Sequence, residues 1–196
     1  MTDDYYATHF EEYHRKTFFI DPTSFLQPLT RFLPPPAHVL DIGCGSGRDL
    51  SWFQRQGYKV TGLERSPGLA CLARDATGAQ ILEADFEIFD FNTLQVDALV
   101  LVGALVHLPP KRVHLTLQRM LKALRDGGYI LVSMKEGCGL WTAPDGRTFY
   151  LWQDKELRRL FDELNLTVLY QARSVSSIGS QEIWLSYVLQ LGKDKS

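Results

Sequence analysis

The chain has 196 residues, 45% of them hydrophobic and 22% charged, and a formal net charge of −2 at pH 7, so it is long enough for one domain and has no general attraction to a phosphate backbone. It has no apolar stretch of the roughly 20 residues that a membrane-spanning helix needs, and its acidic, aromatic start is unlike a signal peptide. Its three cysteines, Cys44, Cys71 and Cys138, have no CxxC spacing and indicate neither a disulfide framework nor a metal site, and we expect a cytoplasmic protein.

The first part of the chain, residues 3–33, is polar and aromatic and predicts a helical segment that ends at the linker LPPP. Its aromatic side chains alternate with charged ones at a spacing that fits one amphipathic helix packed on the rest of the chain. These aromatic residues are Tyr5, Tyr6, Phe10, Tyr13 and Phe18. We expect residues 1–33 to form a helical lid on a domain of residues 34–196.

From Pro34 onward, apolar runs typical of strands alternate with segments of helical periodicity. The expected strands cover residues 38–43, 59–64, 79–85, 96–104, 129–135, 166–175 and 182–191. The expected helices cover residues 47–58, 66–77, 109–128 and 154–165, and Gly127 and Gly128 end the third of them. The pattern predicts a doubly wound α/β sheet of seven mostly parallel strands, in which the last two form an antiparallel pair and the final strand is antiparallel.

The glycine-rich stretch VLDIGCGSGRDL, residues 39–50, follows the first expected strand. In an open α/β sheet, ligands bind beyond the carboxyl ends of the strands. The dinucleotide fingerprint GxGxxG, counted from Gly43 and Gly45, requires a third glycine where the chain has Arg48. No Lys-Ser or Lys-Thr pair follows these glycines, so a phosphate-binding loop is disfavoured as well.

Three acidic residues lie at the ends of three consecutive expected strands: Asp41, Glu64 and Asp85. Glu64 stands 21 positions after Gly43, where a carboxylate can accept hydrogen bonds from both ribose hydroxyls. Any one of the acids could instead cap a helix. Together they indicate a ligand with a cation, a diol and an adenine, and they disfavour a pyrophosphate.

On these residues the chain resembles the class I S-adenosylmethionine-dependent methyltransferases over nearly its whole length. VLDIGCGSGRD is similar to the glycine-rich motif of that family, VTGLERS to its ribose segment and EADFE to its adenine segment. LVGALVHLPP and LRDGGYILVSMKEG are similar to its fourth and fifth strand regions. The likeness is greatest to small bacterial methyltransferases, in the neighbourhood of the tellurite-resistance methyltransferases, and it implies S-adenosylmethionine as the cofactor.

The resemblance also implies which residues hold the cofactor. The three glycines, Gly43, Gly45 and Gly47, would face its methionine part, Asp41 would lie near its ammonium, and Glu64 would hold the ribose. Asp85 and Phe86 would contact the adenine, with Tyr13 and Thr17 of the lid against the cofactor. Arg48 would reach the cofactor carboxylate or cover the first turn of its helix. The expected set is completed by Cys44, a small filler in the turn, and by Arg65 and Gly103.

The region after the fourth strand limits the acceptor. It reads GALVHLPP, which differs from the [Asn/Asp]-Pro-Pro-[Tyr/Phe] motif of methyltransferases that modify amide-type nitrogens. His107 in this segment is a candidate general base or a capping and packing histidine. Lys135, Arg147 and Tyr150 are further candidate catalytic residues, and a lysine and an arginine beside an apolar pocket would suit an anionic acceptor such as a carboxylate. The alternatives are an exposed lysine and an arginine that stabilises a hairpin.

We therefore expect a methyltransferase that acts on a small molecule by in-line displacement, without a metal or a membrane. An RNA- or tRNA-modifying methyltransferase is the alternative enzyme, and a catalytically silent S-adenosylmethionine-binding module is the alternative without chemistry. A monomer or a homodimer would fit any of these three functions.

Overall fold

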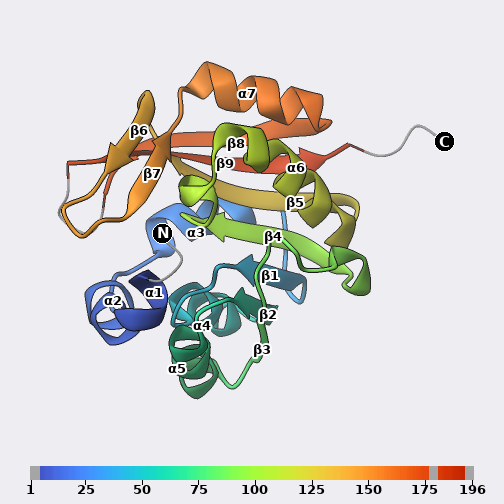
Figure 1. Ribbon diagram of the computed structural model, residues 1–196. Coiled ribbons are helices and arrows are strands. Elements are labelled where there is room, and N and C mark those ends of the chain that lie inside the picture. Colours follow the sequence, from blue (N-terminus) through green and yellow to red (C-terminus); the bar gives the residue numbers. More distant parts are fainter. Residues whose placement is uncertain (1–4, 177–180, 193–196) are drawn as a thin grey trace.

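The sheet of this protein has seven strands in the order β3-β2-β1-β4-β5-β9-β8 (Figure 1). The computed structural model describes residues 5–176 and 181–192. The seven strands are β1 (His38–Ile42), β2 (Lys59–Glu64), β3 (Gln80–Glu83), β4 (Val96–Val102), β5 (Leu124–Lys135), β8 (Leu166–Val175) and β9 (Ile183–Leu191). The pairs from β3 to β5 are parallel, and β9 runs antiparallel to both β5 and β8. This confirms the doubly wound, mostly parallel sheet with an antiparallel final strand.

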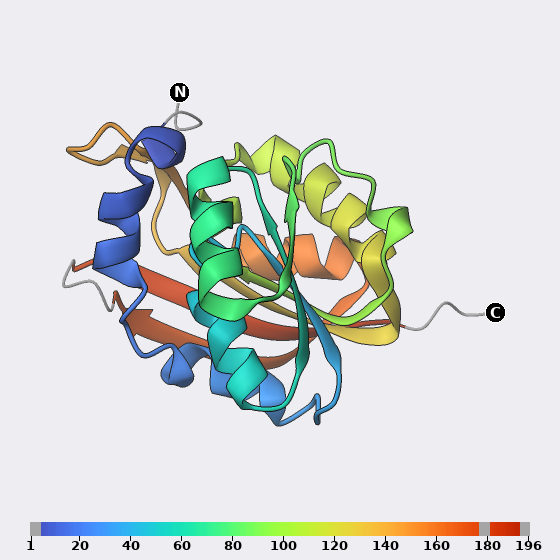
Figure 2. The same cartoon turned by 90° about the horizontal axis from the view of Figure 1, so that it is seen from below.

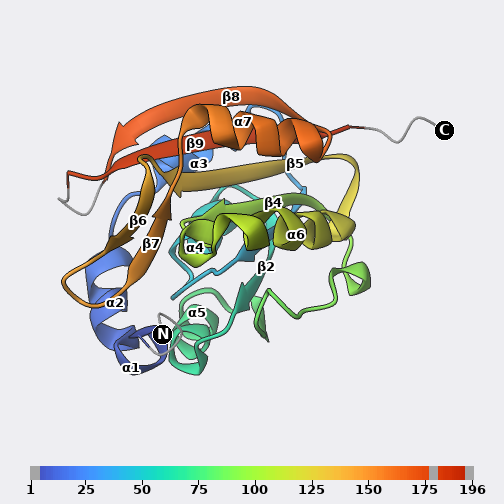
Figure 3. The same ribbon diagram turned by 45° about the horizontal axis from the view of Figure 1, so that its top comes forward.

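Five helices cover the two faces of the sheet. One face carries α3 (Thr23–Thr30), α4 (Arg48–Arg55) and α5 (Pro67–Thr77), and the other carries α6 (Pro110–Met120) and α7 (Asp154–Glu163). Figure 3 shows α6 and α7 in front of the sheet and α3 behind it. Successive residues of β1 point to opposite faces, so Val39 packs with α3 and α4 while Leu40 joins the core under α6 and α7.

The strand order reverses between β2 and β4, which both pair with β1. At such a switch point, the loops at the carboxyl ends of neighbouring strands diverge and leave room for a ligand. The glycine-rich turn lies at this point, between β1 and α4. The third strand ends at Glu83, so Asp85 lies two residues beyond β3 and not at its end as the sequence indicated.

The N-terminal segment divides into three helices, so the expectation of one amphipathic helix is wrong. A break at His9 separates α1 (Tyr5–Thr8) from α2 (Phe10–Thr17). Both lie alongside α5 at the carboxyl ends of the strands (Figure 2). In contrast, α3 belongs to the core, because its Leu26 and Leu29 are fully buried.

The third long helix ends earlier than the sequence indicated. α6 stops at Met120, one short turn of 3-10 helix follows (Leu121–Ala123), and β5 begins at Leu124. Gly127 and Gly128 therefore lie inside a strand and do not end the helix. The register between β4 and β5 shifts at this place, and Gly127 has a φ of +72°. Glycine adopts that conformation without steric strain, so Gly127 and Gly128 allow a β-bulge at this register shift.

A small hairpin inserted between β5 and α7 completes the fold. It consists of β6 (Gly139–Thr142) and β7 (Thr148–Leu151), which pair antiparallel as a separate two-stranded sheet. Two further short 3-10 helices cover Phe91–Thr93 and Leu105–His107. None of the helices in residues 5–176 and 181–192 has the length and apolar character needed to cross a membrane.

Candidate active site

The glycine-rich turn brings the backbone and a tyrosine of α2 into contact. Gly43, Gly45 and Gly47 all have positive φ, at +72°, +57° and +88°. A Cβ atom on Gly45 would lie 3.5 Å from the Tyr13 ring. The ring of Tyr13 thus packs directly over the turn, and side chains larger than glycine would fill the space beside it.

Glu64, the last residue of β2, is fixed by the backbone on both of its oxygens. Oε2 accepts a hydrogen bond from the Gly45 amide (2.9 Å) and Oε1 accepts one from the Ser66 amide (2.8 Å). Burial raises the pKa of Glu64, and these amides oppose the increase. A carboxylate has about four lone-pair sites, so Glu64 keeps acceptor capacity for the hydroxyls of a ligand.

Asp41 of β1 lies beneath the turn as a buried acid. Its Oδ2 is buried and has no hydrogen-bond partner among the residues that the structure describes. Burial raises the pKa of Asp41 well above its usual range; Asp49 and Glu64 add to this effect and Arg48 opposes it. An orphaned acid of this kind favours a cationic ligand group nearby, because a cation restores the ionised form.

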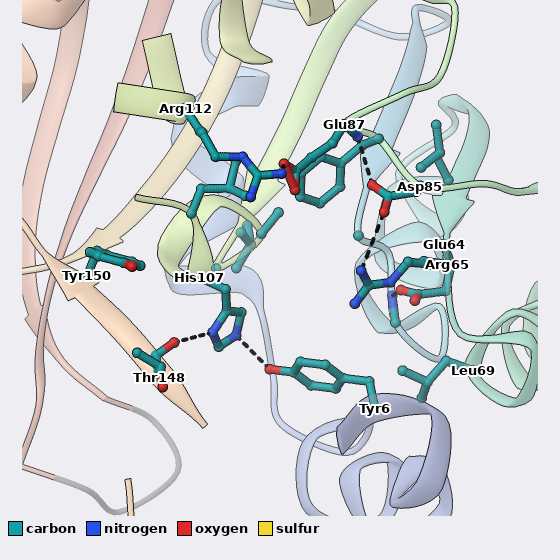
Figure 4. Close-up of a pocket in the computed structure, with 18 of the residues that line it drawn as sticks. Tyr6, Glu64, Arg65, Leu69, Asp85, Glu87, His107, Arg112, Thr148 and Tyr150 are labelled. Carbon is teal, nitrogen blue, oxygen red and sulfur yellow. Dashed lines mark hydrogen bonds and ion pairs between the residues drawn. The ribbon is translucent and has the colours of Figure 1, made fainter. Parts of the chain in front are cut away.

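The loop after β3 forms the opposite side of the same space. Asp85 accepts hydrogen bonds from the Glu87 amide (2.8 Å) and from Arg65 (3.4 Å). Glu87 is in turn paired with Arg112 of α6, which ties the loop to the far face of the sheet. Figure 4 shows Asp85, Arg65 and Glu64 on one side of the space and His107 on the other.

These residues line a first cavity of about 500 Å³ at the switch point. Its lining contains the predicted cofactor residues Tyr13, Gly43, Gly45, Glu64, Arg65, Asp85, Phe86 and Gly103. Three other predicted residues, Asp41 of β1 and Cys44 and Gly47 of the turn, line neither this cavity nor the second one described below. A buried acid, a ribose-type carboxylate and an aromatic side chain beside a carboxylate fit the ammonium, the diol and the adenine of S-adenosylmethionine.

A hydrogen-bonded chain closes the side of this cavity that faces the hairpin. His107 Nδ1 lies 2.6 Å from the Thr148 carbonyl oxygen, and its Nε2 lies 2.9 Å from the Tyr6 hydroxyl (Figure 4). Because a carbonyl can only accept, Nδ1 carries the proton. Burial, together with the nearby cations Arg147, Lys135 and Arg65, lowers the pKa of His107 to about 4. The imidazole is therefore neutral at pH 7, and Nε2 accepts the hydrogen bond of Tyr6.

A second cavity of about 190 Å³ lies on the other side of Tyr6 and His107. Its lining includes four predicted residues that lie outside the first cavity, namely Thr17, Arg48, Lys135 and Arg147. The two cavities share part of their walls. The shared residues are Tyr6, Tyr13, Val102, Gly103 and His107.

The two arginines of the second cavity are each held by a neighbouring acid. Arg48 donates through Nε and Nη2 to Asp49 (2.6 and 3.1 Å), and its Nη1 lies 3.5 Å from the Thr17 carbonyl oxygen. Arg147 donates through Nε and Nη2 to Asp145 (3.0 and 2.7 Å), and its Nη1 donates to Tyr6 (3.3 Å). Arg48 thus links the glycine turn to α2, a contact that adds to its two expected roles, which stay predictions.

Several predicted residues and several unpredicted ones meet at this place. Tyr150 lines the first cavity, whereas Lys135 and Arg147 line the second. The sequence interpretation treated Tyr6 as a packing residue only and did not include Phe149 or Glu182. The alternation of aromatic and charged residues near Tyr6 was the one available signal. The part of the chain that the structure describes has no group of three His, Cys, Asp or Glu side chains placed to hold a metal ion.

Comparisons with known proteins agree with this geometry. A family model described as a methyltransferase domain matches residues 11–171. The 2-methyl-6-phytyl-1,4-hydroquinone methyltransferase of Synechocystis sp. is 30% identical over 139 residues, which cover 67% of this chain and 41% of that protein. A probable S-adenosyl-L-methionine-dependent methyltransferase, TehB of Haemophilus influenzae, is 26% identical over 50% of this chain and 35% of its own length. The chain thus spans less than half the length of these curated relatives.

The fold also matches solved structures. The 1,6-didemethyltoxoflavin-N1-methyltransferase of Burkholderia thailandensis, which holds 1,6-didemethyltoxoflavin and S-adenosylhomocysteine, superimposes with a TM-score of 0.79. It is 23% identical, and the match covers 97% of this chain and 87% of that one, so the likeness is one of fold. By the match of its methyltransferase domain, the chain belongs to the class I S-adenosylmethionine-dependent methyltransferase family, whose methyl donor is S-adenosylmethionine.

Proposed function

We propose that this chain transfers the methyl group of S-adenosylmethionine to a small molecule that carries an anionic group. The observation that carries the proposal is the shared wall of the two cavities, formed in part by Tyr6, Gly103 and His107. S-adenosylmethionine, when bound, supplies a methyl group that its sulfonium already activates. The main task of the chain is then to hold two reactants in line, and such placement contributes roughly 7–11 kcal/mol.

The first cavity provides the groups that the cofactor needs. Glu64 is preorganised by two backbone amides and would hold the ribose hydroxyls. Asp41 would lie near the ammonium, and Asp85 with Phe86 would address the adenine. Gly43, Gly45 and Gly47 would leave room for the methionine part. Tyr13, packed over Gly45, would cover this end of the cofactor.

The hydrogen-bonded chain at the shared wall offers a place for a proton. Tyr6 receives a hydrogen bond from Arg147 and donates its own to His107 Nε2. An acceptor hydroxyl or amine that gives its proton to the Tyr6 oxygen displaces the original Tyr6 proton onto His107 Nε2. The imidazole then carries one proton on each of its two nitrogens. His107 would accept the proton of this relay, which is one of the two roles that the sequence left open. The anionic group of a bound acceptor would raise the pKa of His107 from about 4, because it offsets the nearby cations.

The second cavity sets the size and the charge of the acceptor. Its volume of about 190 Å³ is below the roughly 300–1,000 Å³ of pockets for drug-sized ligands. Three cationic residues, Arg48, Lys135 and Arg147, are part of its lining. A small anion would pair with these cations, whereas the cavity offers little room for a large substrate. Tyr150 at the first cavity would border the route by which the acceptor enters.

The test is a search for the methylated product. The protein is incubated with S-adenosylmethionine carrying a CD₃ group, either with a low-molecular-mass metabolite extract or with total tRNA. We expect S-adenosylhomocysteine and a CD₃-labelled acidic product with the extract, and neither above background with the His107→Ala variant. Product formation with tRNA alone, or none beyond the rate without an acceptor, would contradict the proposal.

A further inference from the structure

The ammonium of Lys135 is enclosed by aromatic rings in the wall of the second cavity. Its Nζ lies 3.6 Å from the ring centroid of Phe149, 4.7 Å from that of Trp141 and 5.4 Å from that of Trp184. The Lys135 side chain is only 6% exposed. Such rings attract a cation but leave little room for water around it. An anion that reaches this ammonium therefore displaces little water.

One carboxylate balances this ammonium. Glu182, which directly precedes β9, pairs with Lys135 Nζ at 2.7 Å. Burial lowers the pKa of Lys135, and Glu182 opposes that shift. The carboxylate of Glu182 therefore already occupies a position that a carboxylate of the acceptor would take.

The remaining charges of the cavity lining are positive. Among the described residues of this lining, Glu182 is the single carboxylate, while Arg48 and Arg147 join Lys135 as cations. The acids that hold the two arginines, Asp49 and Asp145, lie outside the lining. Each accepts hydrogen bonds from the Nε and Nη2 atoms of its arginine. The Nη1 atom of each arginine therefore lies on the edge away from its acid.

Aromatic side chains from several elements share the lining with five aliphatic ones; they are Tyr6, Tyr13, Phe25, Trp141, Phe149 and Trp184. The Trp184 ring covers Gly103, since a Cβ at that glycine would lie 3.4 Å from it. Phe149 lies between the two polar ends, with Lys135 Nζ at 3.6 Å and the His107 ring at 4.6 Å. Aromatic walls favour a planar ring, which packs against them by stacked or edge-to-face contact.

We propose that the second cavity binds a small aromatic carboxylate, with its carboxylate at Lys135 in competition with Glu182 and its ring among the aromatic side chains. The inference rests on the proposed function, because it names the class of the methyl acceptor. It makes Lys135 the residue that selects for charge, and it makes Glu182 a residue that weakens the binding of every carboxylate.

The test compares three probes of similar size on the protein saturated with S-adenosylhomocysteine. Benzoate has the ring and the charge, benzamide has the ring without the charge, and cyclohexanecarboxylate has the charge without a planar ring. Ligand-observed NMR gives the dissociation constant of each. We expect benzoate to bind about tenfold more tightly than benzamide, which loses one charge-assisted contact. It should bind several-fold more tightly than cyclohexanecarboxylate, which keeps the charge but loses the aromatic contact.

Two variants assign the effect to residues. Lys135→Met keeps the length of the side chain and should abolish the preference for benzoate over benzamide, whereas Lys111→Met, on the exposed side of α6, should leave it unchanged. Glu182→Gln should strengthen benzoate binding about tenfold, because it removes a competing charge. Each variant is first shown to bind S-adenosylhomocysteine as the wild type does, which establishes that it folds.

The outcomes separate the two proposals. If wild-type protein does not bind S-adenosylhomocysteine, the proposed function fails and the acceptor class fails with it. If that nucleoside binds but benzoate binds no better than benzamide or cyclohexanecarboxylate, only the acceptor class is overturned. Benzoate binding that persists undiminished in Lys135→Met would overturn it as well.

Discussion

Acidification should destabilise the folded protein through His107. In the folded state, burial and the cations Arg147, Lys135 and Arg65 hold the pKa of His107 at about 4, whereas an unfolded histidine titrates near 6.5. Between about pH 4 and pH 6.5, His107 binds a proton in the unfolded chain but stays neutral in the folded protein. Stability is therefore complete above pH 6.5 and falls as the pH decreases toward 4.

The size of this effect follows from the two pKa values. The full difference corresponds to about 3 kcal/mol of unfolding free energy, and about 2 kcal/mol of it is lost between pH 7 and pH 5. For a domain with a total stability of roughly 5–15 kcal/mol, such a loss is easily measured. Part of it reflects the Tyr6 hydroxyl, which donates to Nε2 only while the imidazole is neutral.

Urea denaturation at pH 7, 6 and 5 measures this loss, with His107→Gln as the matched variant. Glutamine can donate to the Thr148 carbonyl and accept from Tyr6, but it does not titrate. Other buried acids, such as Asp41 and Glu64, affect both proteins alike, so the difference between the two pH profiles reports His107. Profiles that run parallel from pH 7 to pH 5 would refute the assignment of a neutral, buried His107.

Three further substitutions test the site and its lid. His107→Ala should lower the methyl-transfer rate by about 10²–10⁴ while the dissociation constant of S-adenosylhomocysteine stays the same, and an unchanged rate would end its role as a base. Gly68→Ala would place a Cβ 2.6 Å from the Phe10 ring, so it should displace α2 and weaken S-adenosylhomocysteine binding about tenfold by calorimetry; unchanged affinity would show that α2 does not cover the cofactor. Ser66 caps α5 and donates to the Tyr6 carbonyl (2.9 Å), so Ser66→Ala should lower the free energy of unfolding by about 1 kcal/mol, and urea denaturation that shows no loss would contradict this.

The parts of the fold that follow from local periodicity could be predicted from the sequence. The run from Ala98 to Val102 is apolar on both faces, as a central parallel strand requires. The glycine-rich turn and Glu64 are separated by a spacing that the geometry of adjacent parallel strands imposes. The side of the first cavity that the glycine-rich turn and Glu64 form was therefore predictable.

The parts that depend on distant contacts could not be predicted. Tyr6 and His107 are 101 positions apart, and nothing near either residue indicates that they meet. The aromatic enclosure of Lys135 combines a hairpin with the final strand, so no short window of sequence contains it. Gly127 and Gly128 misled the prediction because a glycine pair ends a helix as readily as it forms a bulge.

The stability of the protein toward heat, with and without S-adenosylhomocysteine, tests most directly whether the first cavity is built for the cofactor. At about 100 times its dissociation constant the nucleoside should add roughly 2.7 kcal/mol, which raises the melting temperature by about 5–11 °C for a chain of this size. Glu64→Ala should abolish that shift, and NAD should produce little. A melting temperature that S-adenosylhomocysteine leaves unchanged, or raises equally in Glu64→Ala, would contradict the assignment.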